Sequence, residues 1–151
     1  MRARRIAIAT GLGVAIALLP GPPSAVPARA DAQSDASVAE LMTRDLAGVP
    51  GKEVVVETVE YGPGGSSPAH RHDANVFVYV LSGEYTTQVA GSPPVTLHAG
   101  QVFYESPSDV HQRSENASKT APVKFLVVMV KDKGRTQTRS AAPCYCAGAA
   151  W

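Results

Sequence analysis

Short runs of β-branched, aromatic and aliphatic residues, each followed by turn residues, occupy the middle of the chain. Runs at this spacing, without a long helical period, are typical of an all-β sandwich or barrel. The pattern predicts strands over residues 52–61, 76–81, 84–89, 95–98 and 124–130. In the first of these, the three valines at 54–56 indicate burial on both faces of the strand. We therefore expect a single all-β domain, with its barrel over residues 52–131.

The residues between these runs predict turns. Ser82-Gly83 joins two of the predicted strands and has the form of a two-residue hairpin loop, so we expect Gly83 at a positive φ. After His111 the composition is polar, and we expect a loop that runs through Pro122.

The segments on either side of the barrel differ from it in composition. Residues 31–51 contain a few apolar positions among charged ones, in a stretch too short to predict a helix. We interpret them as an N-terminal arm that lies across the sheet. From residue 132 the chain becomes small, basic and polar, so we expect residues 132–151 to form a flexible C-terminal tail.

The first thirty residues have the pattern of a secretory signal peptide. Arg2, Arg4 and Arg5 precede an uncharged, mostly apolar run at 6–19, and Ala30 ends a segment of small residues suited to cleavage. These 14 apolar residues, at about 1.5 Å each, are too short for a hydrocarbon core of about 30 Å. We therefore expect a secreted or periplasmic protein, cleaved after about Ala30, without a permanent membrane anchor.

Removal of residues 1–30 changes the charge and the interpretation of the cysteines. The remaining chain carries 10 Lys and Arg against 13 Asp and Glu, a net charge of −3, so no basic patch for nucleic acid is expected. Cys144 and Cys146 would then meet an oxidising compartment, but their spacing is too close for an easy bridge between them. An unpaired tail, an intermolecular disulfide and a second metal site all stay open.

Two histidines are the clearest candidates for chemistry. His70 and His72 are one residue apart, at the point where a Pro- and Gly-rich turn leads into an apolar run. Alternate side chains of a strand share one face, so both imidazoles would lie together, with Arg71 on the opposite face. Two imidazoles on one face can bind the same metal ion.

The spacing around these histidines resembles the first cupin motif, G-x5-H-x-H-x3,4-E-x6-G, from Gly64 to Gly83. Residues 100–111, GQVFYESPSDVH, resemble the second motif, G-x5-P-x-G-x2-H-x3-N, and supply a third histidine, His111. The chain is thus identified as similar to the small single-domain cupins of the RmlC-like superfamily. This resemblance implies a cupin β-barrel (jelly roll, or double-stranded β-helix), a metal site of three histidines, and a homodimer.

Both motifs are imperfect. Val76 occupies the position where many cupins place a metal-binding glutamate. Ser106 and Ser108 replace the proline and glycine of the second motif, and Asn116 lies one residue beyond the expected asparagine position. The resemblance therefore implies a site of three imidazoles without the usual carboxylate.

Such a site would leave coordination positions free for water, substrate or dioxygen, as catalytic sites do. Some dioxygenases of the wider cupin superfamily are similar in using three histidines. We therefore expect one divalent metal ion, with Fe favoured and Mn, Ni, Cu or Zn open. The leading hypothesis is a non-haem dioxygenase-like oxidoreductase acting on a small organic molecule. The alternative is a non-catalytic periplasmic sensor or carrier of a small molecule or metal.

Other polar residues are weaker candidates, and none is assigned as catalytic. On a regular strand Arg113 would share the face of His111 and receive a substrate anion, or it would form an ion pair at the rim. Tyr104 and Glu105 precede the second-motif turn and are candidates to orient an imidazole or a bound water. His98, alone on a short strand, is expected to be exposed.

Overall fold

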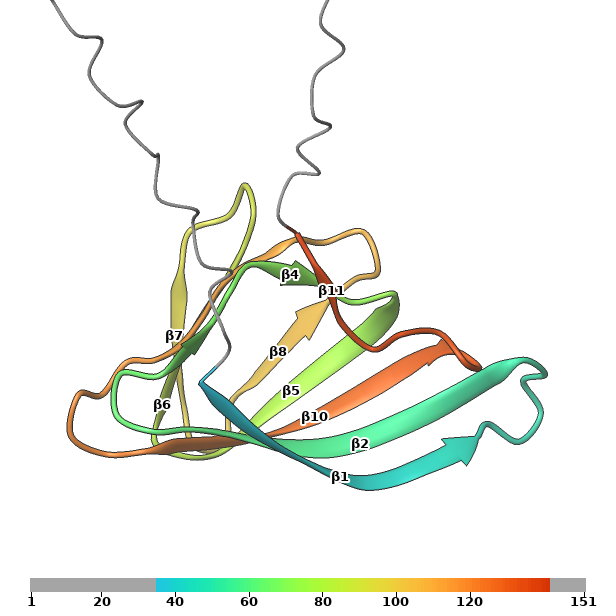
Figure 1. Ribbon diagram of the computed structural model, residues 1–151, viewed down its shortest axis with the longest axis horizontal. Helices are drawn as coiled ribbons and strands as arrows, with labels where there is room; N and C mark the ends of the chain where they lie inside the picture. Colours follow the sequence, from blue (N-terminus) through green and yellow to red (C-terminus); the bar gives the residue numbers. More distant parts are fainter. Residues whose placement is uncertain (1–34, 142–151) are drawn as a thin grey trace, which may run out of the picture. The chain divides into compact units, whose positions relative to one another are not determined.

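The computed structural model describes residues 35–141, which fold into β-strands without a helix (Figure 1). The central strands follow from short runs of β-branched, aromatic and aliphatic residues in the sequence. In chain order they are β1 (Ala36–Asp45), β2 (Lys52–Tyr61), β3 (Ser66–Ser67), β4 (His70–Arg71), β5 (Ala74–Ser82), β6 (Glu84–Val89), β7 (Val95–His98), β8 (Val102–Glu105), β9 (His111–Asn116), β10 (Val123–Asp132) and β11 (Arg139–Ser140).

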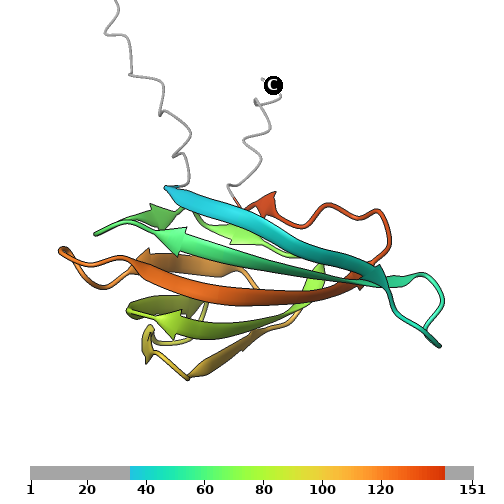
Figure 2. The same cartoon turned by 90° about the horizontal axis from the view of Figure 1, so that it is seen from below.

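The strands form two antiparallel sheets that lie against each other (Figure 2). One sheet has the order β1-β2-β10-β5-β8, and the other has the order β11-β4-β9-β6-β7, with β3 beside β9. Apart from the consecutive pairs β1–β2 and β6–β7, neighbouring strands in each sheet are distant in the chain, as in a jelly roll. The predicted all-β jelly-roll class is confirmed.

The core lies between the two sheets and is built from the inward faces of β2, β5 and β10. These strands alternate between buried and more exposed residues, which places every second side chain in the core. Phe125 stacks on Tyr85 with ring centroids 4.3 Å apart and contacts Tyr61 at 5.7 Å. Burial of this apolar surface is the main stabilising contribution to the fold. The buried apolar side chains include Val55, Val59, Val76, Val78, Val80, Leu97, Val123, Val127 and Met129.

The prediction that β2 is buried on both faces is wrong. Val55 is fully buried, whereas Val54 and Val56 are only partly buried. An antiparallel sheet can expose one face to solvent, and the outer face of β2 is in this position.

Gly83 has a positive φ of 80°, as predicted, but the turn does not form a hairpin. β5 pairs with β10 and β8, whereas β6 pairs with β9 and β7, so the turn carries the chain from one sheet to the other. A Cβ atom at Gly83 would lie 2.6 Å from the carbonyl oxygen of Pro122. Glycine is therefore required here by both its φ and its close neighbour.

The segments outside residues 52–131 contribute strands to both sheets. Residues 36–45 do not lie across the sheet but extend it, because β1 pairs with β2 along its length. At the other end, β11 pairs with β4 through Arg139 and Ser140, so the tail predicted from residue 132 joins the fold up to residue 141. The predicted signal peptide, its cleavage after Ala30, Cys144 and Cys146 lie outside the described residues.

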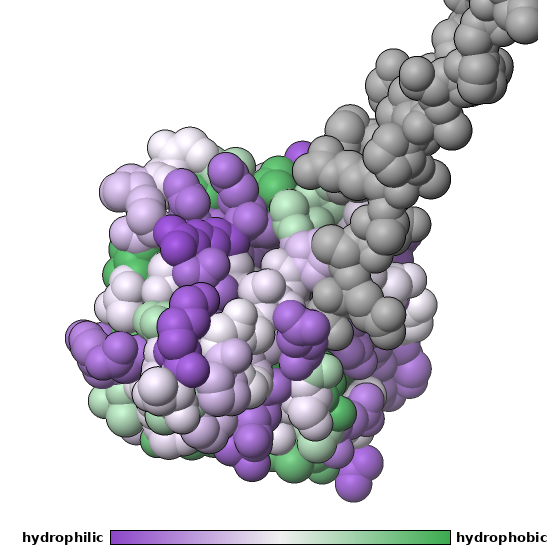
Figure 3. All heavy atoms as spheres, turned by 60° about the vertical axis from the view of Figure 1, so that its left-hand side comes forward, coloured by the Kyte–Doolittle hydropathy of each residue, from purple (hydrophilic) through white to green (hydrophobic). Residues whose placement is uncertain are grey.

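Residues 35–141 contain no helix long and apolar enough to cross a membrane. The side of the molecule that carries β7 shows mostly hydrophilic side chains (Figure 3). Three of the four residues of β7 are exposed, which agrees with a strand at the edge of its sheet.

Candidate metal centre

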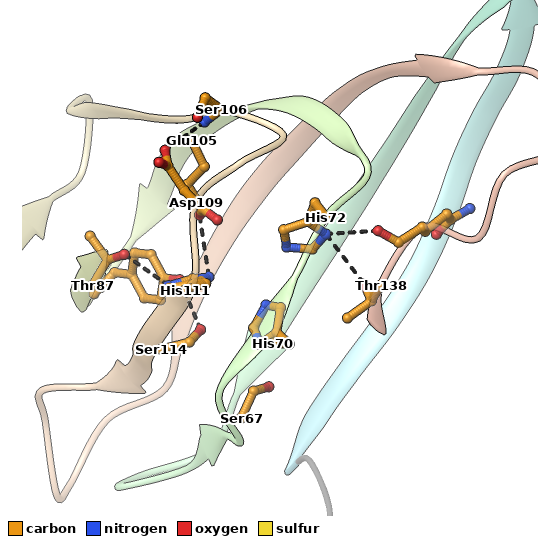
Figure 4. A network of polar contacts seen from close by, with 12 residues as sticks. Ser67, His70, His72, Thr87, Glu105, Ser106, Asp109, His111, Ser114 and Thr138 are labelled. Carbon is orange, nitrogen blue, oxygen red and sulfur yellow. Dashed lines mark hydrogen bonds and ion pairs between the residues drawn. The ribbon is translucent and has the colours of Figure 1, made fainter. Parts of the chain in front are cut away.

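The three histidines predicted to bind a metal come together in the structure (Figure 4). His70 in β4 is paired across the sheet with His111 in β9, and His72 follows β4 directly. The ring centroid of His70 lies 4.7 Å from that of His111 and 4.8 Å from that of His72. One ligand atom of each imidazole lies within 4.8 Å of the other two. The two sequence motifs therefore converge on one cluster.

Backbone carbonyls fix the tautomers of the first two imidazoles. The Nδ1 of His70 lies 2.7 Å from the carbonyl oxygen of Pro68, and the Nδ1 of His72 lies 2.9 Å from that of Gln137. A carbonyl oxygen can only accept, so each Nδ1 carries the hydrogen and each Nε2 retains its lone pair. This is the tautomer needed for metal binding through Nε2.

Gln137 was missed by the sequence analysis. It lies in the segment predicted to be a flexible tail, and it acts through its backbone oxygen. The pairing of β11 with β4 brings this segment next to His72. No side-chain pattern in the sequence signals such a contact.

His111 is held from the opposite side. Its side chain is buried, with its Nε2 2.9 Å from the Thr87 hydroxyl and 3.4 Å from the Tyr85 hydroxyl. Its Nδ1 is buried and has no hydrogen-bond partner among the described residues. A hydrogen on Nε2 can be accepted by the Thr87 hydroxyl, whereas a hydrogen on Nδ1 would be a buried N–H group without a hydrogen-bond partner. We therefore assign the hydrogen to Nε2 and the lone pair to Nδ1. Each of the three imidazoles therefore leaves one nitrogen free to bind a cation.

Burial keeps the three imidazoles neutral at pH 7. Burial, with a smaller contribution from the neighbouring imidazoles, lowers the pKa of His72 to about 4 and that of His111 to about 3. The pKa of His70 is also lowered, again chiefly by burial. Metal ions bind neutral imidazole, so the cluster is in its metal-binding form.

A carboxylate adjoins this cluster. Glu105, at the end of β8, is 2% exposed, and its Oε1 lies 3.2 Å from the Nδ1 of His111. Burial raises the pKa of Glu105 to about 7, with a further contribution from the charge of Asp109. Asp109 accepts a hydrogen bond of 2.7 Å from the backbone N–H of Ser106 and so shapes the turn between Glu105 and His111. Of the weaker sequence candidates, Glu105 is the one that the fold brings to the histidines.

Tyr104 and Arg113 lie elsewhere. Tyr104 is half exposed, donates a hydrogen bond of 2.7 Å to Asn75 Oδ1, and contacts the ring of Phe77 on the outer face of the sheet. Arg113 is exposed and forms an ion pair with Glu115 at 2.5 Å. Of the two roles considered for Arg113, a contact with a substrate anion and an ion pair at the rim, the structure shows the ion pair.

A β-bulge explains the position of Arg113. Gln88 pairs with Arg113 and Val89 pairs with His111, so one extra residue lies in β9 between them. The regular alternation that would place Arg113 beside His111 is broken there.

The same bulge accounts for the displaced asparagine of the second motif. Asn116 is completely buried, and its Nδ2 donates hydrogen bonds to the carbonyl oxygens of Gly62 at 2.9 Å and Ala121 at 2.8 Å. The extra residue in β9 therefore offsets the asparagine by one position without exposing it.

His98 is exposed, as predicted, and its Nδ1 lies 3.6 Å from the Oε1 of Glu84.

Comparison with known proteins agrees with this geometry. Residues 57–129 match the family model of the cupin domain. With the jelly roll and the cluster of three histidines, this match supports a small cupin. No curated protein matches the chain.

Solved structures share the fold at low sequence identity. A cupin-like protein from Thermotoga maritima has a TM-score of 0.57 at 20% identity, over 72% of this chain and 77% of that one. An oxalate oxidase in complex with glycolate has a TM-score of 0.56 at 23% identity, over 73% and 57%. A DMSP lyase from Ruegeria pomeroyi has a TM-score of 0.52 at 22% identity, over 60% and 44%, so the chain spans less than half of that lyase. These similarities concern the fold.

Proposed function

We propose that this protein is a small cupin that binds one divalent metal ion through His70, His72 and His111. The observation that carries the proposal is the convergence of three neutral imidazoles, each with one nitrogen free of hydrogen bonds and all within 4.8 Å. Buried His111 and the backbone carbonyls of Pro68 and Gln137 hold the donors in place before the ion arrives. The donor set fits Fe, Mn, Ni, Cu or Zn.

The proposed activity is that of a non-haem dioxygenase-like oxidoreductase acting on a small organic molecule. Bound iron, the metal that we favour, would supply a Lewis acid and a one-electron redox partner. His70 and His72 are only partly buried, so a small molecule can approach the cluster from their side. The three imidazoles are neutral, so the bound ion keeps a net positive charge, which favours an enolate, a carboxylate or a thiolate as the substrate.

Metal analysis followed by oxygen uptake tests this proposal. The purified protein would be loaded with Fe²⁺ and assayed against oxalate, DMSP, enolates, catechols and thiols, the first two because oxalate oxidase and a DMSP lyase share the fold. We expect oxygen uptake with at least one anionic compound, and its loss in H111A. Metal binding without turnover across the panel would contradict the oxidoreductase assignment.

That outcome would favour a second candidate, a non-catalytic sensor or carrier of a metal or small molecule. The observation in its favour is Val76, a residue without a donor atom at the position of the usual glutamate.

We also propose that the protein is exported as a chain that begins at Asp31, and that it forms a homodimer. The charged, then apolar, then small-residue pattern of residues 1–30 supports export. The intact mass of the protein recovered from the periplasm or the medium tests the cleavage site, since retention of residues 1–30 would contradict it.

A further inference from the structure

The carboxylate missing from β5 has a counterpart on the neighbouring strand. Val76, at the position of the motif glutamate, is 1% exposed and faces the interior of the barrel. Its direct partner across the antiparallel pair is Glu105 of β8. Side chains directly opposite each other in such a pair project from the same face of the sheet with neighbouring Cβ atoms. Glu105 therefore enters the interior one strand away from the expected position.

The surroundings of Glu105 are unusual for a buried carboxylate. The side chain is only 3% exposed. Its carboxylate lies against the Nδ1 of His111, and that nitrogen has no hydrogen-bond partner within residues 35–141 (Figure 4). The charged form of a buried carboxyl group is strongly disfavoured, and a bound cation can compensate it.

The distance between these two atoms is that of neighbouring ligands. Metal–nitrogen and metal–oxygen bonds of about 2.0–2.2 Å place adjacent donors on one ion roughly 3 Å apart. Glu105 Oε1 and His111 Nδ1 are 3.2 Å apart, and the buried Nδ1 has no hydrogen-bond partner in the part of the chain that the structure describes. A cation that touches both atoms would satisfy both of them.

We propose that Glu105 is the fourth protein ligand of the metal ion, so that the carboxylate usually supplied by β5 comes from β8 here. This inference rests on the proposed three-histidine site and adds one negative donor to it. The site would then bind a divalent ion with one compensating charge, while retaining free positions for a small molecule.

Zn²⁺ affinity in three variants tests the assignment. In competition with a chelator, E105Q should bind Zn²⁺ at least about 100-fold more weakly than the wild type. E60Q removes one exposed carboxylate elsewhere and should bind like the wild type. V76E/E105Q returns the carboxylate to β5 and should recover affinity to within about tenfold of the wild type. Circular dichroism would verify that each variant folds.

Infrared difference spectra of the Zn²⁺-loaded minus the metal-free protein separate a ligand from a positioning residue. A ligating carboxylate should give a shifted carboxylate band in the wild type that is absent in E105Q. Equal Zn²⁺ affinity of E105Q and wild type, or the absence of this band in the wild type, would overturn the proposal for Glu105. If the wild type itself binds no Zn²⁺, or if H72A binds as tightly as the wild type, the three-histidine site fails instead.

Discussion

His70 and His111 are direct partners across β4 and β9, with ring centroids 4.7 Å apart. They are the histidines of two motifs about forty residues apart, and a single pair of antiparallel strands brings them together. His72 follows on the same side, held by the chain segment that leads into β11. Strand pairing therefore positions His70 and His111, and a backbone hydrogen bond from a connecting segment positions His72.

Changing Thr87 to Val should weaken metal binding by about tenfold without unfolding the protein. Thr87 is completely buried, and its hydroxyl lies 2.9 Å from the Nε2 of His111. Without this partner the hydrogen can move to Nδ1, where it occupies the lone pair that the ion needs. T96V removes another strand hydroxyl, 3.0 Å from Thr86, and serves as a control that should bind metal normally. Equal affinities in a Zn²⁺ titration of T87V and T96V would contradict this role.

The metal-free protein should lose stability as the pH falls from about 6.5 towards 4. In the unfolded chain the imidazoles take up protons near pH 6.5, whereas in the folded protein His72 and His111 do so only near pH 4 and pH 3. Glu105 partly offsets this loss of stability. Its pKa is raised to about 7 in the folded protein, so below pH 7 the folded protein takes up this proton before the unfolded chain does. In H111A the decline should be shallower, since one proton fewer is taken up on unfolding.

Thermal midpoints of both proteins between pH 4 and pH 8, recorded with a chelator present, test this prediction. A wild-type midpoint that stays constant or rises from pH 6.5 to pH 4 would show that the imidazoles are not held neutral by the fold.

Changing Gly83 to Ala should destabilise the protein far more than the same change at Gly91. Both glycines have a positive φ, which costs a residue with a side chain about 1 kcal/mol. A Cβ at Gly91 has no neighbour within 4 Å, whereas at Gly83 it would meet backbone atoms at 2.6 Å and 2.8 Å. The shift needed at Gly83 should add about 2 kcal/mol. Urea unfolding of G83A and G91A measures the difference, and equal losses would argue against the close packing of this turn.

The proposed homodimer should use the outer face of β5 and β8. Val102 is 70% exposed there, and the face contains a hollow of about 480 Å³ with an almost entirely apolar surface. V102E should convert the dimer to a monomer, because a buried charge without a partner is strongly unfavourable. V95E, on β7 of the other sheet, should remain dimeric. The residues lining the hollow are Phe77, Val78, Tyr79, Val102, Phe103, Tyr104 and Val128.

Light scattering during gel filtration measures the mass of each form. A wild type that is monomeric at all concentrations, or a V102E variant that stays dimeric, would contradict the use of this face.

The sequence predicted the apolar strands and the three histidines because both have local signatures. A continuous apolar run marks β10, and the spacing of His70 and His72 marks a shared strand face. The loop predicted after His111 is wrong up to Asn116, because these residues belong to the strand β9. They are mostly polar, and the strand forms through pairing with its neighbours. The bulge in β9, which turns Arg113 outward, also depends on that pairing.

The contacts that complete the site were equally hidden from the sequence. Gln137 acts through its backbone, and Glu105 gains its significance only from its register opposite Val76. The sequence motif made Glu105 a candidate, but its position opposite Val76 and the contact of Gln137 arise from the pairing of strands distant in the chain.

The number of metal ions bound per chain tests the central claim most directly. Three proteins would be loaded with Zn²⁺ and freed of excess metal: the wild type, H111A and the control H98A, whose histidine is exposed in the structure. Elemental mass spectrometry would then measure the zinc bound to each. We predict one ion per chain in the wild type and in H98A, and a small fraction of that in H111A, because the site loses one of its converging donors. Equal metal content in H111A and H98A, with both variants folded, would contradict the three-histidine site.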